Sequence, residues 1–232
     1  MLFEIKKFIL SAMLLAFSAS SFASANGDIL GTKLTPLGAN PNPSSDGEIP
    51  AWTGGLITPP EGYVRGDPHI DPYNTEQPIL KISAENVDQY RNRLTNTQLS
   101  LISKYSGAYY LNVYKTHRSC AAPQFVYDAT KRNIETAKMV DDGNGFIGAF
   151  AGVPFPIPEN AKEIMWNYQT YYYGYRFSAQ TTGGVMYEDG TFTRTQRNDI
   201  RYSLYNNPQT SSFDDLGGDL FKWTGVYVAP PM

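Results

Sequence analysis

The sequence predicts an α+β fold, in which helices pack on one face of an antiparallel sheet and a loop-like N-terminal arm precedes them. Three observations support this fold class. Proline, glycine and small polar residues punctuate residues 26–80. Apolar residues at helical spacing, with capping signals, follow between Ser83 and Tyr168. From Thr170 onward the apolar period changes to two, which is typical of strands.

The first 25 residues have the features of a secretory leader. Lys6 and Lys7 form a basic region, an apolar stretch starts at Phe8, and small residues end at Ala25. Serines interrupt the apolar stretch, and a membrane-spanning helix would need roughly 20 apolar residues. We therefore expect an exported protein whose signal peptide, residues 1–25, is cleaved near Ala25, with no transmembrane segment in the mature chain.

Charge and composition argue against several functions. The formal net charge is −3 without basic clusters, so we expect no nucleic-acid partner. Two histidines, one cysteine and no Gly-x-Ser-x-Gly motif leave few nucleophile–base pairs, so we expect no enzyme, no catalytic residues and no cofactor. His69 lies between two aspartates, but a polar turn explains this loop better than a metal site.

Cys120 is the only cysteine, which excludes an intramolecular disulfide. It could act as a nucleophile beside His117, but we favour a half-buried structural residue at a strand end.

The arm at residues 26–80 is expected to be ordered rather than a solvated linker. Its turns are separated by large apolar side chains, among them Ile49 and Trp52, which are poor choices for a disordered segment. We expect Trp52 to anchor the arm to a single α+β domain at residues 81–232.

Two helices and a strand are predicted next. Ser83 is an N-cap candidate for a helix that ends near Leu94. Thr95 and Gln98 form a capping box that opens a second, short helix. The strand follows at residues 108–118, with Tyr109, Leu111 and Val113 on one face.

The middle of the chain predicts two further helices. The first covers residues 122–140 and has a stripe of small residues. The second follows an Asn160 cap and places Ile164, Met165 and Tyr168 on one apolar face, with Trp166 to the side.

The C-terminal third predicts an antiparallel meander. Alternation in the tyrosine-rich segment directs Tyr171, Tyr173, Tyr175 and Phe177 to one face of a first strand. Asp189-Gly190 then predicts a type I′ hairpin turn. A long strand and a final strand at residues 221–228 complete the sheet.

The spacing Gly143-x-Gly145-x-x-Gly148 matches a dinucleotide-binding fingerprint. A phosphate loop would follow a buried parallel strand and open directly into a helix, whereas here two aspartates precede the glycines and prolines follow them. We therefore interpret residues 141–158 as a turn and an apolar flap that is stiffened by proline. Such a flap either packs in the core or covers an apolar cavity, and the sequence leaves both open.

Several segments resemble an exported proteobacterial family of unknown function, DUF1329. They are IPAWTGG (49–55), YDATKRN (127–133), AKMVDDGNG (137–145), GVPFPIPENAKEIMWN (152–167) and VAPP (228–231). The resemblance implies a fold similar to the lipoprotein-sorting proteins LolA and LolB of Gram-negative bacteria, with a curved antiparallel half-barrel and helices in its concave side. Members are usually about twice as long, so the resemblance also implies that this chain corresponds to the N-terminal part of an incomplete half-barrel.

From this resemblance we expect a periplasmic, non-enzymatic carrier of an apolar or lipid-like ligand that serves envelope transport or outer-membrane lipid handling. The alternatives are a module that docks on an envelope protein, or a truncated product without independent function. The candidate ligand-contacting side chains lie in the flap, the following helix and the tyrosine-rich segment: Phe146, Phe150, Phe155, Trp166, Tyr171, Tyr173 and Tyr175.

Overall fold

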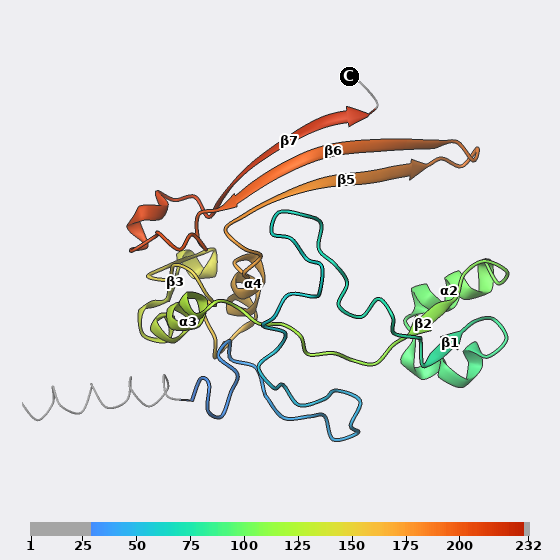
Figure 1. The fold of residues 1–232 in the computed structure, drawn as a ribbon, viewed down its shortest axis with the longest axis horizontal. Coiled ribbons are helices and arrows are strands. Elements are labelled where there is room, and N and C mark those ends of the chain that lie inside the picture. Colours follow the sequence, from blue (N-terminus) through green and yellow to red (C-terminus); the bar gives the residue numbers. More distant parts are fainter. Residues whose placement is uncertain (1–28, 230–232) are drawn as a thin grey trace, which may run out of the picture. The chain divides into compact units, whose positions relative to one another are not determined.

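The computed structural model describes residues 29–229, so the predicted signal peptide lies outside the described residues. The described chain forms two compact units (Figure 1). One consists of residues 42–121, and the other combines residues 29–41 with residues 122–229. These limits differ from the predicted arm boundary at residue 80, because most of the arm shares a unit with the two short helices that follow it.

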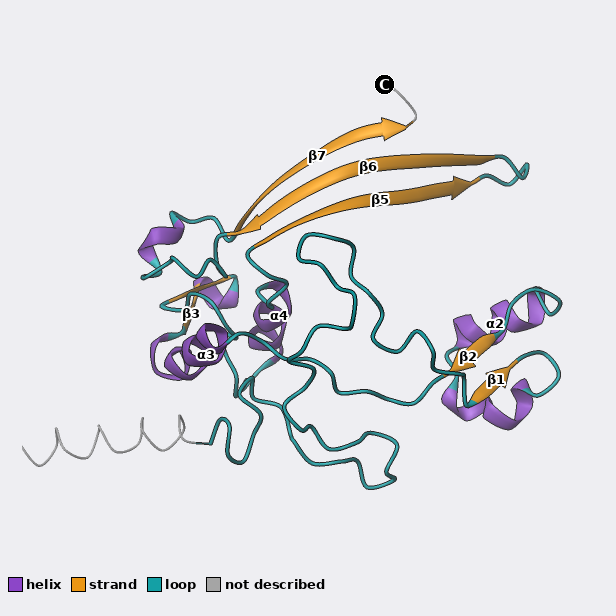
Figure 2. Cartoon of the chain, viewed as in Figure 1, coloured by secondary structure: helices purple, strands orange, loops and turns teal. Residues whose placement is uncertain are grey.

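Loops make up most of the unit at residues 42–121 (Figure 2). Its regular elements are two short strands, one 3-10 helix and one α-helix. They are β1 (Leu80–Ile82), η1 (Val87–Arg93), α2 (Asn96–Lys104) and β2 (Leu111–Val113). Strands β1 and β2 pair antiparallel, and the partly buried residues of β2 are Leu111 and Val113, as the alternation predicts. The predicted strand at residues 108–118 is too long, because only Leu111–Val113 pair and Tyr109 lies outside the strand.

The capping box of α2 is confirmed, since the Thr95 side chain accepts from the Gln98 backbone and Gln98 binds the Thr95 backbone in return. The predicted helix from Ser83 is wrong in type and start, because a 3-10 helix begins only at Val87. The Asn86 amide bridges the Ser83 N–H and the Lys81 carbonyl at 2.9 Å each, which stabilises a turn after β1 in place of a first helical turn.

Trp52 contacts the end of its own unit. Its indole N–H donates to the Cys120 carbonyl at 3.1 Å, and the Leu56 N–H donates to the Ser119 carbonyl at 2.8 Å. Gly55 fits closely here, because a Cβ at this position would lie 2.5 Å from the Cys120 oxygen. These contacts hold a segment without regular structure against the end of the same unit.

The other unit contains two α-helices, a two-stranded and a three-stranded antiparallel sheet, and two 3-10 turns. Its elements are α3 (Gln124–Thr136), β3 (Lys138–Val140), η2 (Asp141–Gly143), β4 (Gly145–Ile147), α4 (Ala161–Gln169), β5 (Arg176–Met186), β6 (Phe192–Ser203), η3 (Asp214–Leu216) and β7 (Phe221–Ala229). Helices and antiparallel sheets together confirm the α+β class, and Figure 1 shows β5, β6 and β7 as one curved sheet.

Helix α3 is shorter than the predicted range of residues 122–140. It ends at Thr136, and residues 138–140 form β3, which pairs with β4. Asp141 and Asp142 make the connecting turn with φ values of 51° and 52°, in the left-handed region. The pairing places Met139 opposite Phe146, and burial of the Phe146 ring favours this hairpin over further helical turns.

The core of this unit is built around Phe146, Ala149, Tyr205 and Leu216. Phe146 packs edge-on against the rings of Trp166 and Tyr205, with ring centroids 5.2 and 6.0 Å apart. The core therefore joins the β3–β4 hairpin, α4 and the segment that follows β6.

The three-stranded sheet has the order β5-β6-β7, which confirms the predicted meander. Its hairpin differs from the predicted type I′ turn. Gly190 has a φ of 85°, whereas Asp189 is outside the positive-φ region that a type I′ turn requires, and the Gly190 N–H binds the Tyr187 carbonyl. The connection is a type I turn closed by a left-handed glycine, which suits a loop one residue longer than a two-residue hairpin.

Candidate ligand-binding site

The glycine-rich segment forms the β3–β4 hairpin and the packed loop behind it. Gly148 has a φ of 77°, and a Cβ there would lie 2.0 Å from the Thr136 carbonyl oxygen. The glycines therefore allow a turn and a close approach of two backbone segments, which agrees with the interpretation of this segment as a turn and a flap.

Polar side chains of α3 hold the flap in place. Asn133, which is buried, donates to the carbonyls of Ala151 and Val153 at 2.8 and 3.1 Å, and Thr130 accepts from the Val153 N–H at 3.0 Å. Satisfied buried amides of this kind fix a loop firmly. The structure shows core packing of the flap, and residues of the flap also border two pockets.

The candidate ligand-contacting residues of the flap are themselves packed in the core or against it. Phe146 is buried, while Phe150 and Phe155 are partly buried against the core. The Arg132 guanidinium lies 3.8 Å from the centre of the Phe150 ring and donates to the Phe150 carbonyl, and burial lowers the pKa of Arg132. Phe146 and Trp166 also border an apolar pocket of about 180 Å³.

Helix α4 is capped by Asn160, as predicted, but its predicted apolar face is wrong. Ile164, Met165 and Tyr168 are exposed, whereas Trp166 turns inward and donates its indole N–H to the Gly143 carbonyl at 3.1 Å. Trp166 lies at the edge of the predicted face, but its larger ring area and its buried hydrogen bond decide which side faces the core.

The tyrosine-rich segment lies outside the strands, since β5 begins only at Arg176. The prediction of a strand at residues 171–175 is therefore wrong. Two of its tyrosines still come together, because the rings of Tyr171 and Tyr173 have centroids 3.6 Å apart and Phe177 continues the row 6.3 Å from Tyr173. Tyr175 takes a different neighbour, with its ring 5.9 Å from that of Tyr202.

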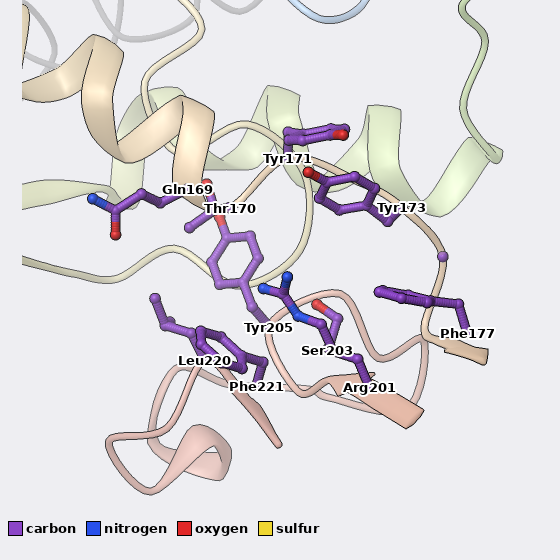
Figure 3. A pocket seen from close by; sticks show the side chains of 11 residues that line it. Gln169, Thr170, Tyr171, Tyr173, Phe177, Arg201, Ser203, Tyr205, Leu220 and Phe221 are labelled. Carbon is purple, nitrogen blue, oxygen red and sulfur yellow. The ribbon is translucent and has the colours of Figure 1, made fainter. Parts of the chain in front are cut away.

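The rings of Tyr171, Tyr173 and Phe177 border a hollow at the base of the sheet (Figure 3). Arg201 of β6 enters it between two rings, with its guanidinium carbon 4.2 Å from the Phe221 centroid and 5.9 Å from that of Tyr173. The hollow encloses only about 10 Å³, roughly the space for one water molecule. It is a place where a small polar group could be gripped at the surface, and it is too shallow to enclose an apolar chain.

The Tyr171 hydroxyl stays protonated over a wide pH range. Partial desolvation and the adjacent Tyr173 hydroxyl raise the pKa of Tyr171 to about 12, although its side chain is 42% exposed. A protonated phenol is a hydrogen-bond donor, so the hollow combines a neutral donor with the Arg201 cation.

Arg201 belongs to a larger surface. Residues directly opposite in an antiparallel sheet share a face, and so do alternate residues of a strand. By this rule one face of the sheet carries a row of charges on β6 and aromatic rings on both neighbouring strands. We call it the aromatic–arginine face: Phe177, Arg197, Asp199, Arg201, Phe221, Trp223 and Tyr227.

Sequence reasoning predicted the long strand but did not single out the arginines of this face. The signal was present in the alternation of Arg197, Asp199 and Arg201 along one strand. Their significance depends on the register with β7, because the pairing sets Trp223 opposite Arg201 and Tyr227 opposite Arg197.

Other candidates from the sequence are not brought into a site. His117 stacks on Tyr73 with ring centroids 3.7 Å apart and contacts Glu76 at 2.8 Å, while Cys120 is exposed rather than half-buried. Across residues 29–229, no cluster of three metal-ligating side chains occurs. Over the same range, no helix is long and apolar enough to cross a membrane.

The fold and the site define an α+β protein whose antiparallel sheet exposes a mixed aromatic and arginine surface. The chain belongs to the family described as proteins of unknown function DUF1329, whose model matches residues 81–232. An uncharacterized protein of Pseudomonas aeruginosa is 44% identical over 167 residues, which cover 72% of this chain and 37% of that relative. The chain thus spans little more than a third of the relative's length. No solved structure matches the chain.

Proposed function

We propose that this protein is a non-enzymatic periplasmic carrier that binds an apolar or lipid-like ligand on its three-stranded sheet and serves outer-membrane lipid or lipoprotein handling. The observation that carries the proposal is the exposure of large apolar side chains on that sheet. Phe221, Trp223 and Tyr227 are each about half exposed, at 50%, 51% and 51%. Contiguous exposed apolar surface commonly marks a ligand or partner site.

The physical basis is removal of apolar surface from water. Each square ångström that a ligand covers contributes roughly 25 cal/mol, so an acyl chain along the strands gains affinity in proportion to its contact length. Because the hollow at the base of the sheet has room for only about one water molecule, the acyl chain is expected to lie along the strands rather than inside that hollow. Arginine stems and tyrosine rings, which are apolar with polar ends, suit the rim of such a surface.

Two further considerations support a periplasmic carrier. The leader-like N-terminus favours export. The family resembles the lipoprotein-sorting proteins in its expected half-barrel, and the curved sheet fits that expectation.

The test is a titration of the exported protein with a fluorescent fatty acyl probe. We expect a saturable signal that weakens in Trp223→Ala, whose ring lies on the aromatic–arginine face, and stays unchanged in Met165→Ala, an exposed apolar change on α4. Absence of saturable binding by protein with a native circular-dichroism spectrum would argue against a carrier.

A docking module is the second candidate, and the open sheet edges favour it. Strands β5 and β7 each have one neighbour in the described sheet, so their outer backbone groups are free to pair with an added strand. Purification from periplasm separates the two functions. A stoichiometric protein partner without co-purifying lipid supports docking, and bound lipid without a protein supports the carrier.

A further inference from the structure

Arg201 carries a charge that no carboxylate of the described residues neutralises. Its guanidinium carbon lies 4.2 Å from the Phe221 ring centroid and 5.9 Å from that of Tyr173. Arg201 takes part in none of the ion pairs found among residues 29–229. A guanidinium between rings keeps its planar set of N–H donors in a fixed orientation, and this arrangement suits the two oxygens of a carboxylate.

Arg197, four residues earlier on the same face, differs in this respect. Its side chain pairs with Asp199 at 2.6 Å, and Asp199 also accepts from Thr181 at 3.0 Å. Asp199 is 5% exposed, and these hydrogen bonds and the Arg197 charge outweigh its desolvation and lower the pKa of its carboxyl group. The Arg197 charge is therefore balanced within the protein, and the aromatic–arginine face has a net charge of one at Arg201.

An aromatic stripe continues from Arg201 along β7: Phe221, Trp223 and Tyr227. Gly225 lies between the last two, and a Cβ there would be 2.6 Å from the Trp223 ring, so this ring lies against the glycine. From Phe221 to Tyr227 the stripe runs about 20 Å along the strand. The surface thus joins one unpaired cation, Arg201, to an aromatic track of the length of a long acyl chain. The guanidinium of Arg197, which is paired with Asp199, lies over this track, 5.0 Å from the Trp223 centroid and 5.7 Å from that of Tyr227.

We propose that this face binds a long-chain fatty acid, with its carboxylate on the Arg201 guanidinium and its acyl chain along Phe221, Trp223 and Tyr227. The inference rests on the proposed carrier function and names its ligand class. A monoanion matches the single unpaired guanidinium. A phosphate monoester head group, with a charge of about −1.5 to −2, would need a second cation, and the Asp199 carboxylate near Arg197 would oppose it.

The hydroxyls of the hollow strengthen this assignment. Tyr171 and Tyr173 border the space beside Arg201 (Figure 3), where a phenol hydroxyl can donate a hydrogen bond to a carboxylate oxygen. Neutral donors add affinity for the anion without adding charge, which again favours a carboxylate over a dianion.

The experiment measures displacement of a fluorescent acyl probe from the exported protein by palmitate, hexadecanol and hexadecyl phosphate. We expect palmitate to bind at least about tenfold more tightly than the uncharged alcohol, since a charge-assisted hydrogen bond contributes this much. Arg201→Gln should remove this preference and leave hexadecanol binding unchanged, and Arg201→Lys should restore part of it.

Arg176→Gln is the matched control. Arg176 also stacks on a ring, with its guanidinium carbon 5.6 Å from the Tyr202 centroid, but the register places it on the opposite face of the sheet. Its substitution should leave the palmitate preference intact. A second variant, Tyr227→Ala at the far end of the stripe, should weaken the binding of palmitate several-fold. The binding of octanoate, whose chain is too short to reach Tyr227, should be unaffected.

The outcomes separate the two proposals. Equal binding of palmitate and hexadecanol, an unchanged preference in Arg201→Gln, or tighter binding of hexadecyl phosphate than of palmitate overturns the fatty-acid assignment while a carrier function stands. Failure of all three amphiphiles to displace the probe, or of the probe to bind folded protein, overturns both.

Discussion

Phe146 and Arg201 show how differently two single residues contribute. Phe146 is 7% exposed and lies among the rings of Phe155, Trp166 and Tyr205, where it fixes the hairpin, α4 and the end of β6 relative to one another. Arg201 is stacked on rings beside solvent, and its charge is available to an incoming group. The first residue contributes to stability, and the second is the residue on which the proposed binding depends.

Phe146→Ala is expected to lower the free energy of unfolding by about 3–5 kcal/mol, because it removes a buried ring and leaves a cavity. Denaturant titration followed by tryptophan fluorescence measures this change. Ile147→Ala is the matched control. Ile147 is the next residue of β4 and is 42% exposed, so its truncation should lower the free energy of unfolding by well under half of the loss in Phe146→Ala. Similar losses in both variants would contradict the packing described for Phe146.

At the scale of elements, helix ends follow local chemistry while helix faces follow the core. The Asn160 side chain accepts from the Glu163 N–H at 3.1 Å and fixes the start of α4. The Glu163 carboxylate in turn accepts from the Asn160 side chain and from the Glu159 N–H. This local network could be recognised in the sequence, but the inward turn of Trp166 could not.

Asn160→Ala is expected to destabilise the protein by about 1 kcal/mol, because a helix N–H loses its acceptor. Asn160→Asp keeps the acceptor and adds a favourable charge at the helix N-terminus, but it loses the donor to Glu163 and places two carboxylates together, so it should recover only part of the lost stability. Thermal unfolding followed by circular dichroism compares the three proteins. Equal melting temperatures for Asn160→Ala and the wild type would show that the cap contributes nothing.

The η3 turn gives a pH-dependent contribution. The N–H and hydroxyl of Ser211 and the groups of Ser212 hydrogen-bond to Asp215 and lower the pKa of its carboxyl to about 2. An unfolded aspartate titrates near about 3.9. The ionised form is therefore favoured by folding, so the contribution is full above about pH 4 and is lost as the pH falls toward 2.

Asp215→Asn is expected to melt at a lower temperature than the wild type at pH 6, and the gap should close between about pH 4 and pH 2. Scanning calorimetry across this range measures it. Asp214→Asn removes a charge one residue away and should produce a smaller gap at pH 6. A gap for Asp215→Asn that stays constant down to pH 2 would contradict this role of Asp215.

At the scale of the whole molecule, the described residues divide into a loop-rich unit at residues 42–121 and a second unit that holds the curved sheet. The first depends on point contacts such as that of Trp52, and the second on an aromatic core. Many large apolar side chains of the sheet remain exposed, among them Trp223 and Val226. This exposure is the reason for assigning a binding function to the second unit.

Export gives the prediction at this scale. Expressed in a Gram-negative host with its own N-terminus, the protein is expected in the periplasmic fraction with Asn26 as its first residue, because the residues up to Ala25 have the order of a secretory leader. Intact-mass spectrometry of the fraction locates the cleavage. Replacing Lys6 and Lys7 by glutamate should slow cleavage of the leader. Retention of the unsubstituted protein at full length in the cytoplasm would contradict export.

The sequence by itself determined the α+β class, the meander, the caps at Thr95 and Asn160, and the family, because each depends on local periodicity or on short motifs. It did not determine which face of α4 is buried, where α3 ends, or at which residue after the tyrosine-rich segment β5 begins. These depend on competition for the core, in which Phe146 and Trp166 displace residues with a better local pattern. Only the tertiary structure set Arg201 between Phe221 and Tyr173, since strand register and a loop from before β5 bring the three together.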